Sequence, residues 1–167
     1  MIEFTDNNEL KSIYIKASGH VTAQYCSEVK NFCFSELNED SSVNHVYLDM
    51  ENCDYMDSTF IGVIAGINKR LKKISGESIQ IQNIGKTCLS LLKTMGLLPL
   101  ITILEKPITF PIMKQSCSVQ EKITAGDILE VHEELMDISD DNKKRFSTLH
   151  QILSDEVEES LDECKWL

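Results

Sequence analysis

The chain has 167 residues, enough for one domain of ordinary size and an additional segment. Its hydrophobic fraction of 42% and charged fraction of 26% are those of a globular protein that folds in water. The longest uninterrupted apolar run, residues 60–67, is far shorter than the ~20 residues that a membrane-spanning helix needs. The net charge of −11 opposes binding to nucleic acid, whose phosphates would repel it. We therefore expect no direct contact with nucleic acid and no insertion into a membrane.

The negative charge is concentrated toward the C-terminal end. Residues 124–167 hold 13 acidic and four basic residues, a balance of −9, whereas residues 1–123 hold 14 and 12, a balance of −2. The first residues, Met-Ile-Glu-Phe-Thr-Asp, lack the basic flank and apolar core of a signal peptide. The six cysteines are scattered and do not have metal-site spacing. These features predict a cytoplasmic protein with reduced thiols, no metal site and no cofactor.

The first part of the chain predicts two strands followed by a helix. Residues 2–5 and 10–17 read as strands joined across a turn-like polar cluster between them. Gly19 is expected to end the second strand, and Thr22 to cap a helix that runs to about residue 37. The buried side of that helix would be a line of four residues: Cys26, Val29, Cys33 and Leu37.

The central segment, residues 43–74, predicts a strand, a short acidic loop and a helix. Residues 43–50 are rich in β-branched and aromatic residues and alternate as a buried strand face requires. Asp57 and Ser58 stand where an N-cap belongs, because their side-chain oxygens accept hydrogen bonds from the free amides of a first turn. Gly76 is expected to terminate the helix. The apolar residues of the helix recur every three or four positions: Phe60, Ile64, Ile67, Leu71 and Ile74.

Two further strands and one more helix are predicted before residue 107. Strands are expected at 78–82 and 101–104, and the helix between them follows Gly85 and ends at Gly96. A chain that opens with a strand pair and then alternates strands with helices indicates an α/β (α+β) fold, a mixed β-sheet with helices packed on it.

The C-terminal part predicts a linker and an acidic extension. Residues 107–123 contain two prolines and show no clear period, which is typical of a linker after a domain of residues 1–106. Thr124 and Asp127 resemble a capping box, and the segment 124–167 reads as an amphipathic acidic helical hairpin. Its apolar side could pack back on the body, against a second copy in a homodimer, or in the groove of a partner.

The hydroxyl groups at the start of the central helix belong to a recognisable signature. Residues 56–62, Met-Asp-Ser-Thr-Phe-Ile-Gly, resemble the signature of the STAS domain of anti-sigma-factor antagonists, and the order of elements over residues 1–106 agrees. In that family the serine after the aspartate is phosphorylated by a serine kinase that is itself the anti-sigma factor, and a PP2C-type phosphatase reverses it. The resemblance therefore implies a STAS-like fold and a phosphoprotein modified at Ser58, with Thr59 as the alternative acceptor.

Two functions are compatible with this sequence. The first is signal transduction in transcription regulation by partner switching: the unphosphorylated chain binds the kinase/anti-sigma factor, and the added charge of the phosphate releases it. The second is a non-switching interaction module, a scaffold or transport-system subunit, in which Ser58 is only a helix cap and Gly62 and Gly66 allow close approach of a partner or of the sheet. The residues expected to contact a partner are Asp54, Met56, Asp57, Ser58, Thr59, Phe60 and Gly62.

The sequence shows no motif of an enzyme active site. It has no Gly-x-Ser-x-Gly elbow, no Walker loop and no zinc motif. Asp49, near the end of a buried strand, is placed as the phosphoacceptor of a receiver domain would be. However, the first long strand is followed by Lys16-Ala17-Ser18-Gly19, which lacks the acidic pair that would hold magnesium. We therefore expect a protein without catalytic residues.

Overall fold

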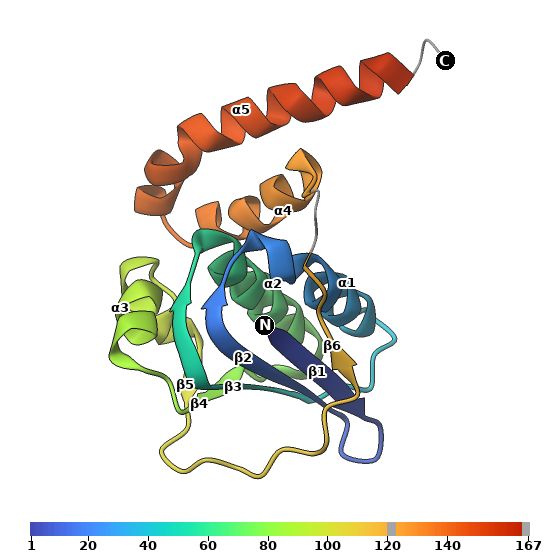
Figure 1. The fold of residues 1–167 in the computed structure, drawn as a ribbon, viewed down its shortest axis with the longest axis vertical. Coiled ribbons are helices and arrows are strands. Elements are labelled where there is room, and N and C mark those ends of the chain that lie inside the picture. Colours follow the sequence, from blue (N-terminus) through green and yellow to red (C-terminus); the bar gives the residue numbers. More distant parts are fainter. Residues whose placement is uncertain (120–122, 165–167) are drawn as a thin grey trace.

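The computed structural model describes residues 1–119 and 123–164, the last three of them by their backbone alone. Six strands form one mixed sheet in the order β5-β4-β3-β2-β1-β6, which confirms the predicted α/β class (Figure 1). Strand β1 pairs antiparallel with β2 and with the edge strand β6, and the remaining neighbours are parallel. The strands are β1 (Ile2–Asn7), β2 (Ser12–Val21), β3 (His45–Met56), β4 (Gln80–Gln82), β5 (Thr102–Ile103) and β6 (Gln115–Ser116).

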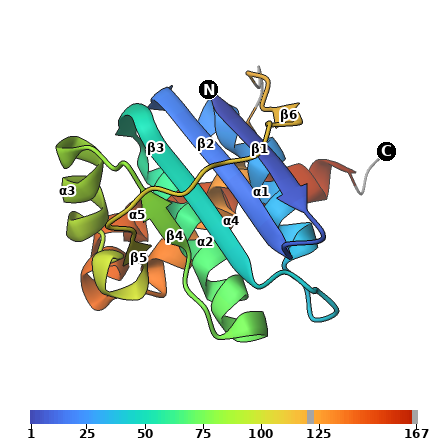
Figure 2. The ribbon, with the colours of Figure 1, turned by 90° about the horizontal axis from the view of Figure 1, so that it is seen from below.

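Two helices cover one face of this sheet, and an extended segment crosses the other (Figure 2). The helices are α1 (Cys26–Glu36) and α2 (Ser58–Ser75), while α3 (Lys86–Thr94) lies beside β3. The segment that crosses the open face was predicted as a linker, and it is held to the sheet. The Ile108 amide donates to Gln82 Oε1 at 2.8 Å, and the Phe110 ring contacts Tyr14 with the ring centroids 5.1 Å apart. This contact and the pairing of β6 with β1 close that side of the domain.

The core lies between the sheet and the two covering helices. Alternate residues of β2 and β3 face the helices, so Ile13, Ile15, Val46 and Leu48 are buried, whereas Tyr14 faces the crossing segment. The predicted line of α1 is also buried: Cys26, Val29, Cys33 and Leu37. The 2.0 and 3.6 residue periods in the sequence therefore identified the core faces correctly.

The two central strands are longer than the sequence predicted. Gly19 does not end β2; it has φ +66°, and the register with β3 is irregular just after it, so glycine permits a bulge where a strand end was expected. The predicted acidic loop after residue 50 is wrong, because β3 continues to Met56. Its polar residues face solvent, while Cys53 and Met56 are buried and β2 supplies the hydrogen bonds.

The start of the first helix also differs from the prediction. Thr22 makes no side-chain capping bond; a 3₁₀ turn, Ala23–Tyr25, comes first and α1 begins at Cys26. The Ala23 amide is instead bound by the carboxylate of Asp57, which is remote in sequence. A local capping pattern could not reveal this partner.

Two C-terminal helices complete the molecule, α4 (Ala125–Met136) and α5 (Asp140–Cys164). Thr124 Oγ1 accepts a hydrogen bond from the Asp127 amide at 3.1 Å, as the capping pattern indicated. In Figure 1, α4 lies between the body and α5. At the turn between them, Asn142 donates to the backbone oxygens of Leu135 at 2.9 Å and Met95 at 3.0 Å. The apolar side of α4 thus packs on the body, one of the three expected ways to cover it, whereas Ile152 and Leu161 of α5 are exposed.

Candidate functional site

The helix α2 starts where the sequence indicated, with Asp57 as its N-cap. Asp57 Oδ1 accepts from the Phe60 amide at 3.1 Å, and Oδ2 accepts from the Ala23 amide at 2.8 Å. One carboxylate thus joins the 3₁₀ turn before α1 to the first turn of α2. Ser58 is the first residue of α2, and the capping bond is made by its neighbour. The helix ends at Gly76, whose φ of +77° is the left-handed conformation of a C-cap.

The Ser58 hydroxyl is directed at α4. Its Oγ lies 3.0 Å from His132 Nε2, and His132 Nδ1 lies 2.8 Å from the Ile128 carbonyl oxygen. A carbonyl oxygen accepts only, so Nδ1 donates to Ile128, and the Ser58 hydroxyl and Nε2 share the second hydrogen bond. His132 is 2% exposed and its ring meets Phe146 of α5 edge-on, with the centroids 5.0 Å apart. The C-terminal hairpin therefore covers the predicted phosphoacceptor.

Glycine at position 62 allows α4 to approach α2 closely. A Cβ added to Gly62 would overlap the carbonyl group of Val131, so a larger residue would push the two helices apart. Val131 and Leu135, on the side of α4 that meets α2, are fully buried. The close approach expected at this glycine is thus present, and the approaching element is a helix of the same chain.

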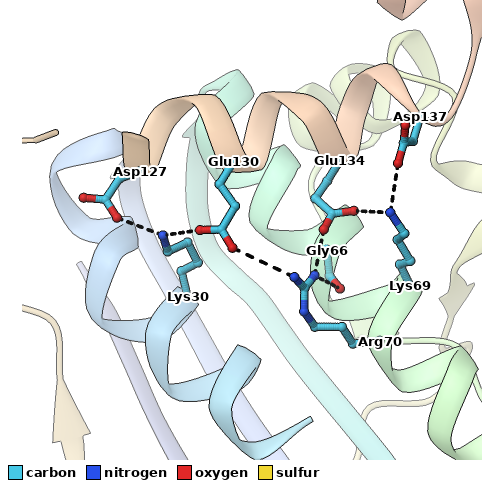
Figure 3. A network of polar contacts seen from close by, with 8 residues as sticks. All are labelled: Lys30, Gly66, Lys69, Arg70, Asp127, Glu130, Glu134 and Asp137. Atoms are coloured by element: carbon cyan, nitrogen blue, oxygen red, sulfur yellow. Dashed lines mark hydrogen bonds and ion pairs between the residues drawn. The ribbon is translucent and has the colours of Figure 1, made fainter. Parts of the chain in front are cut away.

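A lysine of α1 binds the first half of α4 (Figure 3). The Lys30 ammonium lies 2.8 Å from Asp127 Oδ1 and 2.7 Å from Glu130 Oε2, and its side chain is 6% exposed. Burial lowers the pKa of Lys30, but its hydrogen bonds to both carboxylates outweigh this effect and raise it. Burial raises the pKa of Asp127, and hydrogen bonds from Lys30 and Thr124 more than reverse that shift. Each partner thus stabilises the charged form of the other.

Two basic residues of α2 bind the second half of α4 (Figure 3). Arg70 donates to Glu134 at 2.8 Å, and its guanidinium stacks 3.6 Å from the ring centroid of Phe34. Lys69 donates to Asp137 at 2.9 Å and to Glu134 at 3.0 Å, and these bonds raise the pKa of Lys69. The acidic residues on this side of α4 therefore face basic residues of the body along the whole helix.

The predicted partner-contact residues do not form one exposed surface. Three of them have buried side chains: Met56, Thr59 and Phe60. Two others, Ser58 and Gly62, are in contact with α4. Asp57 caps α2, and Asp54 is exposed on β3. Phe60 belongs to the apolar period of α2, which already placed its ring in the core. That a partner binds the start of α2 stays a prediction, and the surface offered to it would be the part that α4 covers.

Sequence reasoning missed the residues that cover Ser58. His132 was not singled out, and the lysine on α1 was passed over because only the apolar line of that helix was considered. A signal was present: acidic residues recur at 127, 130, 134 and 137, the spacing of one helix side, beside Val131 and Leu135. That pattern indicates an acidic helix with a binding side, but it does not identify the basic residues opposite.

Asp49, considered as a receiver-type phosphoacceptor, has a structural role. Its carboxylate accepts hydrogen bonds from the Glu51 amide and from the side chains of Gln82 and Asn83, each at 3.0 Å. These bonds tie β3 to the end of β4. The oxygen atoms that a receiver domain would use for chemistry are thus engaged in holding two strands together.

The STAS domain family matches residues 3–109, which is more than half of the chain. The chain belongs to the STAS domain family. Its fold resembles the anti-sigma factor antagonist SpoIIAA in unphosphorylated form (TM-score 0.53, 12% identity, 64% of this chain and 90% of that one). It also resembles the phosphorylated form of SpoIIAA from Bacillus (TM-score 0.52, 14% identity, 64% and 93%). A candidate anti-sigma factor antagonist from Thermotoga maritima is similar as well (TM-score 0.51, 18% identity, 62% and 85%).

The match to the STAS domain includes the sheet strands β1 to β5 and helices α1 to α3, and it ends before β6. The hairpin of α4 and α5 lies outside the matched residues, although it is packed on the matched part. Among residues 1–119 and 123–164, no helix combines the length and apolar character needed to cross a membrane.

Proposed function

We propose that this STAS protein is an anti-sigma-factor-antagonist-like regulator that acts by partner switching, with Ser58 as the phosphorylated residue. The observation that supports it is the position of Ser58 as the first residue of α2. Free backbone amides and the positive end of the helix dipole stabilise an added phosphate there. SpoIIAA, which has the same fold, is known in unphosphorylated and phosphorylated forms.

The proposed partner is a serine kinase that is also an anti-sigma factor, with a PP2C-type phosphatase that restores the unmodified state. Phosphorylation adds about −1.5 to −2 charge at the start of α2. Asp57 is adjacent and Asp54 is exposed nearby in sequence, so the phosphate increases an existing negative charge. Like charges in a docked interface weaken binding, and the partner is released. The protein itself performs no catalysis in this scheme.

Ser58 is a better acceptor than Thr59 by position. The Thr59 side chain is 8% exposed and lies in the space between α1, α2 and α4, whereas Ser58 stands at the end of the helix. A kinase has to bring its ATP to the hydroxyl, so the residue at the helix end requires less movement of the protein.

The decisive experiment is the intact mass of the full chain after incubation with MgATP and the anti-sigma-type serine kinases of its own genome. We expect wild type and Thr59→Val to gain one phosphate and Ser58→Ala to gain none. Loss of the phosphate in Thr59→Val alone would identify Thr59 as the acceptor. If all three proteins keep their mass, partner switching at this site is wrong.

A second experiment measures binding of the same kinase to two variants. Ser58→Asp places a negative charge where the phosphate would lie, and Ser58→Ala keeps the site neutral. We expect the aspartate variant to bind at least about tenfold more weakly, because a like-charge contact in an interface costs more than 1.4 kcal/mol. Equal affinities would argue that charge at this residue does not control the partner.

A non-switching interaction module is the second candidate function. The hydrogen bond from Ser58 to His132 favours it, because that bond gives the hydroxyl a structural role in holding α4. The mass experiment distinguishes the two candidates, because a module that does not switch takes no phosphate. In that case Ser58→Ala should still weaken the contact between α2 and α4, because it removes the hydrogen bond to His132.

A further inference from the structure

The helix α4 occupies the surface that the proposed partner needs. His132 holds the Ser58 hydroxyl, and the Val131 carbonyl lies against Gly62 one turn further along α2. Ser58 is partly buried, and a phosphate on it would replace the hydroxyl that binds His132 Nε2, beside a ring that is 2% exposed. Phosphorylation of Ser58 therefore weakens the docking of α4, and a partner that binds this surface competes with α4.

The surface beneath α4 has a definite chemistry. We call it the docking face, and define it as Lys30 of α1 together with Gly62, Lys69 and Arg70 of α2. Gly62 lets an incoming helix lie close to α2, and the three cations bind carboxylates that are three or four residues apart on that helix. Such a face suits an acidic amphipathic helix (Figure 3).

The contact between α4 and the body combines ion pairs with the buried side chains of Val131 and Leu135. Its charged groups would be stabilised by water if the helices separated, so the cost of opening would come mainly from exposing that apolar contact. The STAS domain match ends at residue 109, and the sheet with α1 to α3 lies within it apart from the two-residue β6. Contacts of this type between units of one chain resemble transient interfaces between proteins.

We propose that the docking face is the binding surface for an acidic amphipathic helix of the partner, and that α4 is an intramolecular occupant which this helix displaces. The proposal rests on the proposed function and names the element of the partner and the control of its access. Because the two occupants compete, α4 lowers the apparent affinity for the partner, and phosphorylation of Ser58 favours the undocked state by the same coupling.

A native thiol reports whether α4 is docked. Cys26, at the start of α1, is 3% exposed and lies in a small space that Asp127, Ile128 and Val131 of α4 also line. Burial raises its pKa strongly, so the thiol is protected both by access and by protonation. Cys33 lies about two turns further along α1 and is fully buried. It serves as the internal control for unfolding of the body.

The test uses the full chain and site-resolved labelling of its cysteines by a maleimide. The open variant, Glu130→Lys with Glu134→Lys, places positive charge against Lys30 and Arg70. The probe is a synthetic peptide of residues 123–139 with the native acidic sequence, and the control peptide carries the same two lysines. A companion variant, Gly62→Ala, opens the contact by a methyl group and leaves the charges of both helices unchanged.

We expect Cys26 of the open variant to react at least about tenfold faster than in wild type, while Cys33 stays protected. The native peptide should slow Cys26 again toward the wild-type rate, and the lysine peptide should have no effect. In Gly62→Ala the labelling should also be fast, but the native peptide should fail to protect, because the methyl group occupies the space a helix backbone needs.

Three outcomes would overturn the proposal. Wild-type labelling rates at Cys26 in both variants would show that α4 does not separate from the body. Simultaneous reaction of Cys33 would show that α4 is part of one cooperative core. Fast labelling without protection by the native peptide would show that the docking face does not accept an acidic helix. None of these measurements involves phosphate, so a failure of Ser58 to be phosphorylated leaves this result standing and refutes the proposed function alone.

Discussion

The two sides of α2 are packed by different kinds of contact. Toward the sheet the helix is apolar, and Phe60, Ile64 and Leu71 are at most 1% exposed. Toward α4 it offers Gly62 and the buried Val63, which lines a small space with Ile128 and Val131, and the basic residues Lys69 and Arg70 lie beyond them. Apolar surface gains free energy only while water is excluded, whereas charged groups are also stable in water. The side toward the sheet is therefore wholly apolar, whereas the side toward α4 combines a smaller apolar contact with ion pairs, and we expect the second to open more easily.

This difference assigns separate roles to neighbouring residues of one helix. A change toward the sheet should destabilise the whole molecule, and a change toward α4 should affect only the C-terminal hairpin and access to Ser58. Hydrogen exchange resolves the two cases, because it reports opening free energies element by element.

Truncation of Phe60 should have the largest effect. Phe60→Ala removes a core ring that is 1% exposed, at an expected cost of about 3–5 kcal/mol of unfolding free energy. Urea denaturation should show the loss, and amides of β3, α2 and α4 should all exchange faster. The matched change on the other side, Val131→Ala, should cost about 2 kcal/mol and act on α4 and α5 alone. If both changes speed exchange equally in β3, the distinction between the two sides is wrong.

The Gly62→Ala substitution should separate the two sides most clearly. Alanine favours a helix interior over glycine by about 1 kcal/mol, so the body should be no less stable. The added methyl group meets the Val131 carbonyl, so amides of α4 and α5 should exchange faster. Gly126→Ala in α4 is the control, since a Cβ there meets its neighbours only at 3.9 and 4.0 Å and should slow exchange instead. Faster exchange in both variants would show that the effect is not steric.

The ion pairs should contribute less, and unequally. Lys30→Met removes a cation that is 6% exposed and leaves two carboxylates of α4 without their partner, at a cost of about 1 kcal/mol to docking, since those carboxylates are partly solvated. Lys73→Met removes an ion pair with Glu39 whose side chains are 70% and 84% exposed, and should change nothing measurable. Cys26 labelling at low and high salt compares the two. Equal effects would show that burial of the pair is unimportant.

The pH dependence of docking should be the smallest effect. The pKa of Asp127 is lowered in the folded protein. Its carboxylate therefore stabilises the fold at pH values above the ordinary pKa of 3.8, and this stabilisation is lost as the pH falls through the lower pKa of the folded state. The difference in unfolding free energy between wild type and Asp127→Asn, under about 1 kcal/mol near neutral pH and measured by thermal denaturation, should therefore vanish in that acidic range. A difference that persists there would assign the effect of the substitution to something other than its charge.

The sequence predicted the body well because its signals are local. The apolar period of α2, the cap at Asp57 and the stop at Gly76 lie within a few residues of the elements they define. The end of β2 was misplaced because glycine both breaks strands and permits bulges, and only pairing with β3 decides between them. The site was harder still, since the contact of Ser58 with His132 joins residues 74 positions apart and no local pattern reveals such a pair.

The central claim is that α4 and the partner compete for the start of α2. The most direct measurement is the initial rate at which the cognate kinase phosphorylates Ser58 in wild type, in Glu130→Lys with Glu134→Lys, and in Gly126→Ala. The account predicts a rate at least about tenfold higher in the double variant, because α4 no longer covers the hydroxyl, and no increase in Gly126→Ala. Equal rates in wild type and the double variant would contradict it.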